Sequence, residues 1–294
     1  MELQWGRRYV MVEPSHFRVE YAINPFMHLD DQPDLDLAQQ QWRDLVATIE
    51  SLGGTVDAIA QREDAPDMVY AMNLGMAFTS AAGERRVLMS HMRFPERRME
   101  TGSAAQWFAA DGRALAYAGK DGVGPVLEAG DFFAFGDALV VGYGPRTDEL
   151  ALKSLAAEMG VRVRGVRTTH PGMYHLDLAF CPLDDRRAIV CPAALDEASA
   201  EALLALVPEP LVITEEEALE TFCANSIVIG STVVMPACPA HVRAQLEEWG
   251  FAVVLVDVSE FHKGGGSIRC LTNPVDVVVG RDLPSVVGGE VLVP

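Results

Sequence analysis

The chain has 294 residues, a formal net charge of −19 at pH 7 and 49% hydrophobic residues. The negative charge disfavours nucleic acids and anionic membranes as partners, because their phosphates would be repelled by a surface without a basic patch. No stretch approaches the ~18 apolar residues that a membrane span needs, and the N-terminal residues lack the apolar core of a signal peptide. Five cysteines without a Cys-x-x-Cys pair argue against a disulfide framework and a zinc knuckle. We therefore expect a soluble cytoplasmic protein.

Helical periodicity alternates with pairs of short apolar runs along the chain. The predicted helices are Leu35–Leu52, Arg98–Ala110, Glu149–Met159, Leu195–Leu206 and Ala240–Trp249. The predicted strand pairs are Met68–Ala71 with Gly75–Thr79, Asp131–Phe135 with Ala138–Gly142, Leu176–Pro182 with Ala188–Pro192, and Ser226–Ile229 with Thr232–Pro236. A fifth pair requires Arg269–Pro274 and Val275–Gly280 from the C-terminus to meet Tyr9–Glu13 from the N-terminus.

This repetition predicts a closed α/β ring of five units, in which the last unit borrows a strand from the first. Closure would bury the sheet edges and leave a central axis onto which one face of every hairpin projects. The same elements are also compatible with an ordinary two-domain α/β protein. Because no linker or low-complexity segment interrupts the sequence, we favour a single domain over residues 1–294.

The segment Met173–Phe180 places a histidine and an acid together. His175 and Asp177 are two residues apart, so on a strand both side chains would point to the same face. A carboxylate beside an imidazole is typical of a general acid and base. A structural hydrogen-bonded pair would have the same pattern.

Cys270 follows the glycine run Gly264–Gly266 and stands next to Arg269. Glycines let the backbone approach a ligand closely, and a cationic neighbour favours the thiolate. Cys270 is therefore a candidate nucleophile, and a buried cysteine after a loop is the alternative. The histidines outside the His175 segment have no metal-ligand spacing, so we expect no metal site.

Three further segments carry polar residues where a core would have apolar ones. They are Leu127–Asp131 with Glu128, Asp64–Gly75 with Asp67 and Asn73, and Tyr21–Met27 with Asn24.

Together these segments resemble the guanidine-modifying (amidinotransferase or pentein) superfamily over essentially the whole chain. Its members include arginine deiminases, dimethylarginine dimethylaminohydrolases, glycine amidinotransferases and arginine dihydrolases. The matching pieces, in order, are Asp67 to Asn73, Phe94–Glu100, Glu128–Asp131, Gly142–Thr147, His175–Asp177 and Cys270. The resemblance implies a five-bladed ββαβ propeller around a central axis, no cofactor, and a small guanidino substrate such as arginine or methylated arginine.

The resemblance also implies catalytic roles. Cys270 would attack the guanidinium carbon, and His175 would protonate the departing amine and then activate water. Glu128 and Asp177 would hold the guanidinium and orient His175.

Three more residues would bind the substrate. Arg97 and Arg146 would hold its α-carboxylate, a match that the guanidinium fork makes well, and Asp67 would be a further acidic group. A planar cation is suited to flanking carboxylates, and its charge helps a nearby thiol to ionise.

Two asparagines distinguish the branches of the superfamily. In the dimethylarginine-hydrolysing branch an aspartate stands where this chain has Asn73, whereas the pair of Asn24 and Asn73 resembles the arginine dihydrolases. Those enzymes convert arginine to ornithine, carbon dioxide and two ammonia molecules. An amide can donate a hydrogen bond to the neutral ureido oxygen of citrulline, and an ionised carboxylate cannot.

We therefore predict an arginine dihydrolase. The alternatives are a dimethylarginine dimethylaminohydrolase, which gives citrulline and dimethylamine, and an arginine deiminase. A non-catalytic pentein-fold binding protein, such as a ribosome-binding anti-association factor, has no need of Cys270, His175 and Glu128 together. The sequence is compatible with a homo-oligomer.

Overall fold

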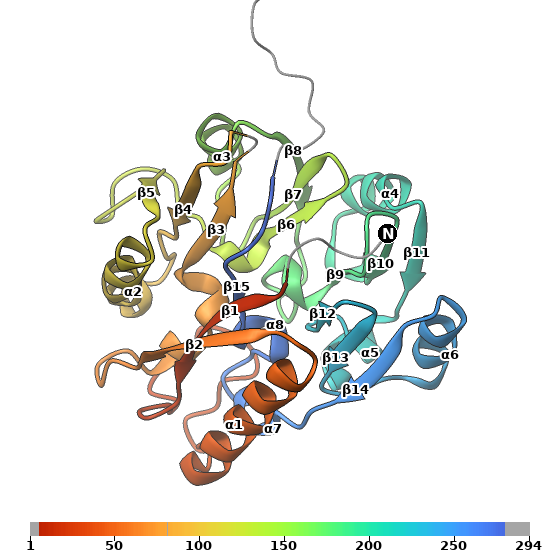
Figure 1. Cartoon of the computed structure of the whole chain (residues 1–294), viewed down its shortest axis with the longest axis horizontal. Coiled ribbons are helices and arrows are strands. Elements are labelled where there is room, and N and C mark those ends of the chain that lie inside the picture. Colours follow the sequence, from red (N-terminus) through yellow and green to blue (C-terminus); the bar gives the residue numbers. More distant parts are fainter. Residues whose placement is uncertain (1–5, 81, 280–294) are drawn as a thin grey trace, which may run out of the picture.

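The computed structural model describes residues 6–80 and 82–279. Five three-stranded sheets surround a common axis, with the longer helices on the outside (Figure 1). In every sheet a central strand pairs antiparallel with one neighbour and parallel with the other. The predicted α/β propeller of five ββαβ units is therefore confirmed.

Each unit contributes two antiparallel strands, a helix and a parallel strand. The first unit consists of β15 (Asn273–Pro274), β1 (Arg8–Glu13), α1 (Leu35–Ser51) and β2 (Thr55–Ala60). The second and third are β3 (Gly75–Thr79), β4 (Arg85–Met89), α2 (Arg98–Ala110) and β5 (Ala114–Tyr117), then β6 (Phe132–Phe135), β7 (Ala138–Tyr143), α3 (Ala151–Met159) and β8 (Arg162–Arg167). The fourth and fifth are β9 (Phe180–Pro182), β10 (Arg187–Val190), α4 (Glu197–Leu206) and β11 (Glu209–Val212), then β12 (Ile227–Ile229), β13 (Thr232–Met235), α6 (Ala240–Glu248) and β14 (Ala252–Leu255). Three shorter helices are α5 (Glu215–Thr221), α7 (Ser259–His262) and α8 (Ile268–Leu271).

The outer helices are amphipathic, as α1 illustrates. The side chain of Asp34 caps this helix by accepting a hydrogen bond from the amide of Leu37. Trp42, Leu45 and Ile49 recur at the helical spacing and are buried. Within the described residues, every helix is too short or too polar to cross a membrane.

The apolar core lies between neighbouring units rather than on the axis. One buried cluster, for example, brings together Phe133 of β6, Phe180 of β9, Val190 of β10 and Val233 of β13. Because these contacts already join the units, the axis is free to hold polar side chains.

The ring closes through strands from opposite ends of the chain. In β15 and β1, Pro274 pairs antiparallel with Tyr9 and Asn273 pairs with Val10, which confirms the predicted strand exchange. The predicted strand Val275–Gly280 is wrong where it is described, because its only ladder contact there is a bridge between Val278 and Thr79. Gly280 lies outside the described residues.

Several predicted strands begin with a short helical turn instead. Pro66–Val69 and Ala71–Leu74 are 3-10 turns, so β3 pairs with β4 and not with Met68–Ala71. Leu176–Leu178 is likewise a 3-10 turn, and Cys270 lies in α8 rather than in a strand. Short apolar runs that are buried on all sides have the same pattern in either conformation, which explains the error.

Candidate active site

The turn before the first strand of each unit reaches the axis, and these turns carry the polar residues of the site. They bring Asp67 and Asn73 before β3, Glu128 before β6, His175 and Asp177 before β9, Asn225 before β12 and Cys270 before β15. All seven residues are buried. The ring therefore gathers the same position of every unit at one point.

His175 is held by a buried carboxylate. Its Nε2 lies 2.8 Å from Oε2 of Glu128, which also pairs with Nη1 of Arg146 at 3.2 Å. Burial alone would raise the pKa of Glu128, but Arg146 and His175 outweigh it and hold that pKa well below its usual range. The other oxygen, Oε1, accepts a hydrogen bond from the amide of Arg93. Both oxygens are thus engaged within the protein, which favours orienting His175 over holding a substrate.

Three side chains converge on Gly130. A Cβ atom at this position would lie 2.9 Å from Oδ1 of Asn73, 3.0 Å from Oδ2 of Asp177 and 3.1 Å from Nδ1 of His175. A larger residue would displace at least one of them. The predicted placement of His175 and Asp177 on one strand face is wrong, since a 3-10 turn carries Asp177, but the two side chains do approach each other.

The thiol of Cys270 donates a hydrogen bond to Oδ2 of Asp177 at 3.3 Å. Burial and the neighbouring carboxylate raise the pKa of Cys270 well above its usual value, and burial raises the pKa of Asp177. The proton therefore stays on sulfur in this state. The second oxygen, Oδ1 of Asp177, is buried without a hydrogen-bond partner among the described residues. An unpaired carboxylate oxygen of this kind is suited to a cation.

Asp67 and Asn73 are the site residues of the two helical turns before β3. Asp67 is buried, and its Oδ1 also has no hydrogen-bond partner within the described residues. Burial raises the pKa of Asp67. The positive charge of Arg97, whose Nε lies 3.9 Å from Oδ2 of Asp67, acts in the opposite direction and is the weaker effect. Oδ1 of Asn73 accepts a hydrogen bond from the amide of Gly130 at 2.9 Å. This bond fixes the orientation of the amide and leaves Nδ2 of Asn73 to donate.

The two arginines that the sequence assigns to a substrate carboxylate have partners inside the protein. Nε and Nη2 of Arg97 donate to both oxygens of Glu100, at 2.8 and 2.9 Å. Arg146 pairs with Glu128, and its guanidinium lies between the rings of Phe94 and Tyr174, at 4.7 and 4.4 Å from their centroids. A substrate carboxylate could use only the donors that these contacts leave over.

A narrow cavity lies at the axis. Its lining includes seven of the predicted site residues: Asn24, Asp67, Asn73, Arg97, Arg146, His175 and Cys270. The remaining two, Glu128 and Asp177, contact His175 and Cys270 directly.

Asn24 comes from the long loop between β1 and α1, and its Nδ2 donates to the carbonyl of Gly264 at 3.0 Å. The glycine run approaches side chains of the protein itself, since a Cβ at Gly264 would lie 2.0 Å from the hydroxyl of Tyr70. Tyr70 and Tyr174 donate to the carbonyls of Phe261 and Gly265 and so position the run that precedes Cys270.

The site contains three residues beyond those predicted to be catalytic or substrate-binding: Tyr70, Tyr174 and Asn225. The tyrosines have the pattern of core aromatics. Asn225 begins the fourth predicted hairpin at a position that faces the axis, which predicts a contact with the site, and in the structure its side chain contacts Cys270. Among the described residues, no group of histidine, cysteine and acidic side chains could hold a metal ion.

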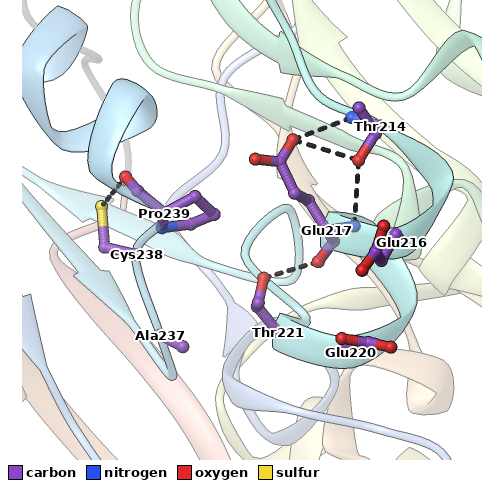
Figure 2. Close-up of a pocket in the computed structure, with 8 residues that line it drawn as sticks. All are labelled: Thr214, Glu216, Glu217, Glu220, Thr221, Ala237, Cys238 and Pro239. Atoms are coloured by element: carbon purple, nitrogen blue, oxygen red, sulfur yellow. Dashed lines mark hydrogen bonds between the residues drawn. The ribbon is translucent and has the colours of Figure 1, made fainter.

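A second pocket is more open and lies beside α5 (Figure 2). Its polar groups serve the helix end, because Thr214 and Glu217 form a reciprocal capping box. Cys238 on the opposite wall is half-buried and contacts the carbonyl of Pro239. Among the described residues that line this pocket, none has a buried polar side-chain atom without a hydrogen-bond partner, whereas Asp67 of the axial cavity does.

Comparison with known proteins places this site in a family. The family model of eukaryotic N,N dimethylarginine dimethylhydrolases matches residues 13–277. The N(G),N(G)-dimethylarginine dimethylaminohydrolase of Mycobacterium tuberculosis is 37% identical over 266 residues, which are 90% of this chain and 85% of that protein. The bifunctional arginine dihydrolase/ornithine cyclodeaminase ArgZ of Synechocystis is 30% identical over 290 residues, which are 96% of this chain and 40% of that protein.

The solved structures agree with the sequence matches. The N-terminal domain of ArgZ, a cyanobacterial arginine dihydrolase, crystallised as a mutant with substrate, has a TM-score of 0.85 at 27% identity. The match covers 92% of this chain and 99% of that domain. The chain is therefore an enzyme that hydrolyses amidino C–N bonds of a small guanidino substrate, and it belongs to the dimethylarginine dimethylaminohydrolase family.

Proposed function

We propose that the protein is an arginine dihydrolase, which converts arginine and two water molecules to ornithine, carbon dioxide and two ammonia molecules. Residues 1–294 would form its single catalytic domain. The observation that supports this choice is the amide of Asn73, which presents a hydrogen-bond donor to the cavity because Gly130 occupies its oxygen. Relatives named as arginine dihydrolases add support, among them AgrE, whose mutant crystallised with L-arginine has a TM-score of 0.87 at 29% identity.

In the first round, the guanidinium of arginine binds against the unpaired oxygens of Asp67 and Asp177. Its positive charge offsets the carboxylate beside Cys270, so the pKa of the thiol falls and the thiol gives its proton to His175 as the thiolate forms. The sulfur attacks the guanidinium carbon. His175 protonates one amino group, which leaves as ammonia, and an S-linked thiouronium remains on Cys270.

Water then completes this round. His175 removes a proton from the water, which adds to the thiouronium carbon, and the C–S bond breaks to give citrulline and the thiolate. Glu128 holds the imidazole of His175 in the same orientation when it donates a proton and when it accepts one.

In the second round, Cys270 attacks the neutral ureido carbon of citrulline. The oxygen of this group gains negative charge and needs a donor, which Asn73 supplies and an aspartate could not. The C–N bond to the side chain breaks, and ornithine leaves with a proton from His175. Hydrolysis of the S-carbamoyl group gives carbamate, which decomposes to carbon dioxide and ammonia.

Product analysis tests the proposal. Incubation with arginine should release ornithine and ammonia in a 1:2 ratio, by the stoichiometry above, with citrulline only as a transient. In Asn73→Asp, citrulline should accumulate, because the second round loses its donor, while the first round keeps a carboxyl group beside the cation. Citrulline as the end product of the unmodified enzyme would contradict the dihydrolase.

A second candidate is dimethylarginine hydrolysis to citrulline and dimethylamine. The 37% identity to the mycobacterial dimethylaminohydrolase over 85% of its length favours it. Parallel assays with asymmetric dimethylarginine distinguish the two, because release of dimethylamine with little turnover of arginine would select this alternative.

The steric role of Gly130 makes a further prediction. Gly130→Ala should lower kcat by about 100-fold, because the added methyl group displaces Asn73, Asp177 or His175 from the reacting atoms. The backbone of Gly130 is not in the left-handed region, so the fold should tolerate alanine. Steady-state kinetics and thermal unfolding measure both effects. Gly102→Ala on α2 is the control, since nothing lies within 4 Å of its Cβ position, and equal kcat for the two variants would rule out the convergence at Gly130.

A further inference from the structure

We propose that Asn225 is a positioning residue that sets the location and the ionisation of the Cys270 thiol. The idea rests on the proposed function, because it treats Cys270 as the nucleophile.

Asn225 contacts Cys270 at two points. Its Nδ2 lies 3.1 Å from the sulfur, and its Oδ1 accepts a hydrogen bond from the backbone amide of Cys270 at 3.1 Å. Nδ2 also donates to the carbonyl of Asp177 at 3.0 Å. One side chain therefore links the nucleophile to the turn that carries the carboxylate facing it.

The orientation of the amide is determined by these partners. Oδ1 faces an N–H group and can only accept, so Nδ2 must be the group that faces sulfur and the carbonyl of Asp177. The backbone around Asn225 is held as well, since its amide donates to the carbonyl of Phe222 at 2.8 Å and its carbonyl accepts from the amide of Arg269 at 3.1 Å. Asn225 is fully buried, so water does not compete for these bonds.

The charged and titratable groups around the sulfur act in opposite directions. Burial and Asp177 raise the pKa of Cys270, whereas hydrogen bonds from the Ser267 backbone and from Asn225 lower it. Arg269, which directly precedes Cys270 in the chain, is buried close to Asp177 and Cys270. The phenols of Tyr70 and Tyr174 and the imidazole of His175 complete the cavity wall beside the thiol.

Asn225 thus offsets part of the effect of Asp177. Asp177 keeps the thiol protonated until a cation arrives, and the N–H group of Asn225 stabilises the thiolate once the proton leaves. Without this donor, a cationic substrate would still bind, but a smaller fraction of the bound complexes would contain thiolate.

The test is the pH dependence of Cys270 alkylation by iodoacetamide, followed on the peptide that contains Cys270 by mass spectrometry. Asn225→Asp keeps the acceptor for the Cys270 amide and replaces the N–H donor by a carboxyl group. The apparent pKa of the thiol should rise by at least one unit, so that alkylation near neutral pH becomes about tenfold slower. The value of kcat should fall at least tenfold and recover toward higher pH, while KM stays within about twofold.

Two further variants complete the design. Asn225→Ala also removes the donor and should raise the same pKa, so it replaces Asn225→Asp if that variant does not fold. Ser226→Ala removes a hydroxyl whose one hydrogen bond to a described residue goes to the carbonyl of Cys223, and this variant should behave as the unmodified enzyme. Alkylation with an unchanged pH profile in the folded Asn225 variant would overturn the proposal. Because alkylation needs no guanidino substrate, this result does not depend on whether the enzyme hydrolyses arginine.

Discussion

Replacing Cys270 by serine is expected to lower turnover by about 10⁴-fold or more, because a buried hydroxyl does not ionise near neutral pH and cannot form the S-linked adduct. The substitution is small, and Asn225 and Asp177 can still hydrogen-bond to the hydroxyl. The melting temperature should therefore change by only a few degrees. Ammonia release and thermal unfolding of the same preparation measure the two effects.

Cys238 provides the matched control. It is half-buried on the wall of the pocket beside α5, packs against an apolar cluster rather than lining the axial cavity, and contacts the carbonyl of Pro239. Cys238→Ser should retain full turnover. A Cys270→Ser enzyme with substantial activity would show that another group is the nucleophile.

Asp177→Asn should change two reactivities of the enzyme in opposite directions. Asp177 raises the pKa of the Cys270 thiol, so replacing its carboxylate by the neutral amide of asparagine should lower that pKa. Alkylation by uncharged iodoacetamide near pH 7 should then become faster. Turnover should nevertheless fall by about 100-fold or more, because the guanidinium loses the carboxylate that receives it. The thiol becomes more reactive while the enzyme becomes less active.

This opposite change is tested by measuring two quantities on the same protein from about pH 6 to about pH 9. They are the alkylation rate of Cys270 and kcat. Asp131→Asn is the control for the alkylation rate, because Asp131 is also a buried acid but accepts its hydrogen bonds from Thr147 and from the amide of Leu176 rather than from the thiol. Slower alkylation in Asp177→Asn, or unchanged turnover, would contradict the role proposed for this carboxylate.

The ring could be predicted from the sequence because each unit repeats the same order of apolar runs, helix and turn. Four strand pairs are consecutive in the sequence, so a fifth pair had to combine strands from the two ends of the chain. The pairing of β15 with β1 confirms this exchange. The helical turns before the strands could not be predicted, because runs such as Met68–Ala71 are buried on every side and lack a period.

The site was predictable where unusual residue types stand at short spacing, as with His175 and Asp177, or where a cysteine follows a glycine run, as with Cys270. It was harder to predict which charged side chains of the site pair with one another. Arg97 lies three residues before Glu100, a spacing that brings side chains together on a helix, and the structure pairs them. The contact between Arg146 and Glu128 depends on the folded ring, so no local pattern could reveal it.

Closure of the ring has a consequence for when the enzyme can work. Cys270 lies in the short helix α8 just ahead of β15, the last strand of the described chain to be synthesised, and that strand is only two residues long. During translation the other four units can assemble while the nucleophile is still missing. In the finished protein this seam is buried, and Asn273 holds it in place by donating to the carbonyls of Ala71 and Gly75. The thiol should therefore stay at the axis until the ring itself opens, so heat inactivation should coincide with global unfolding.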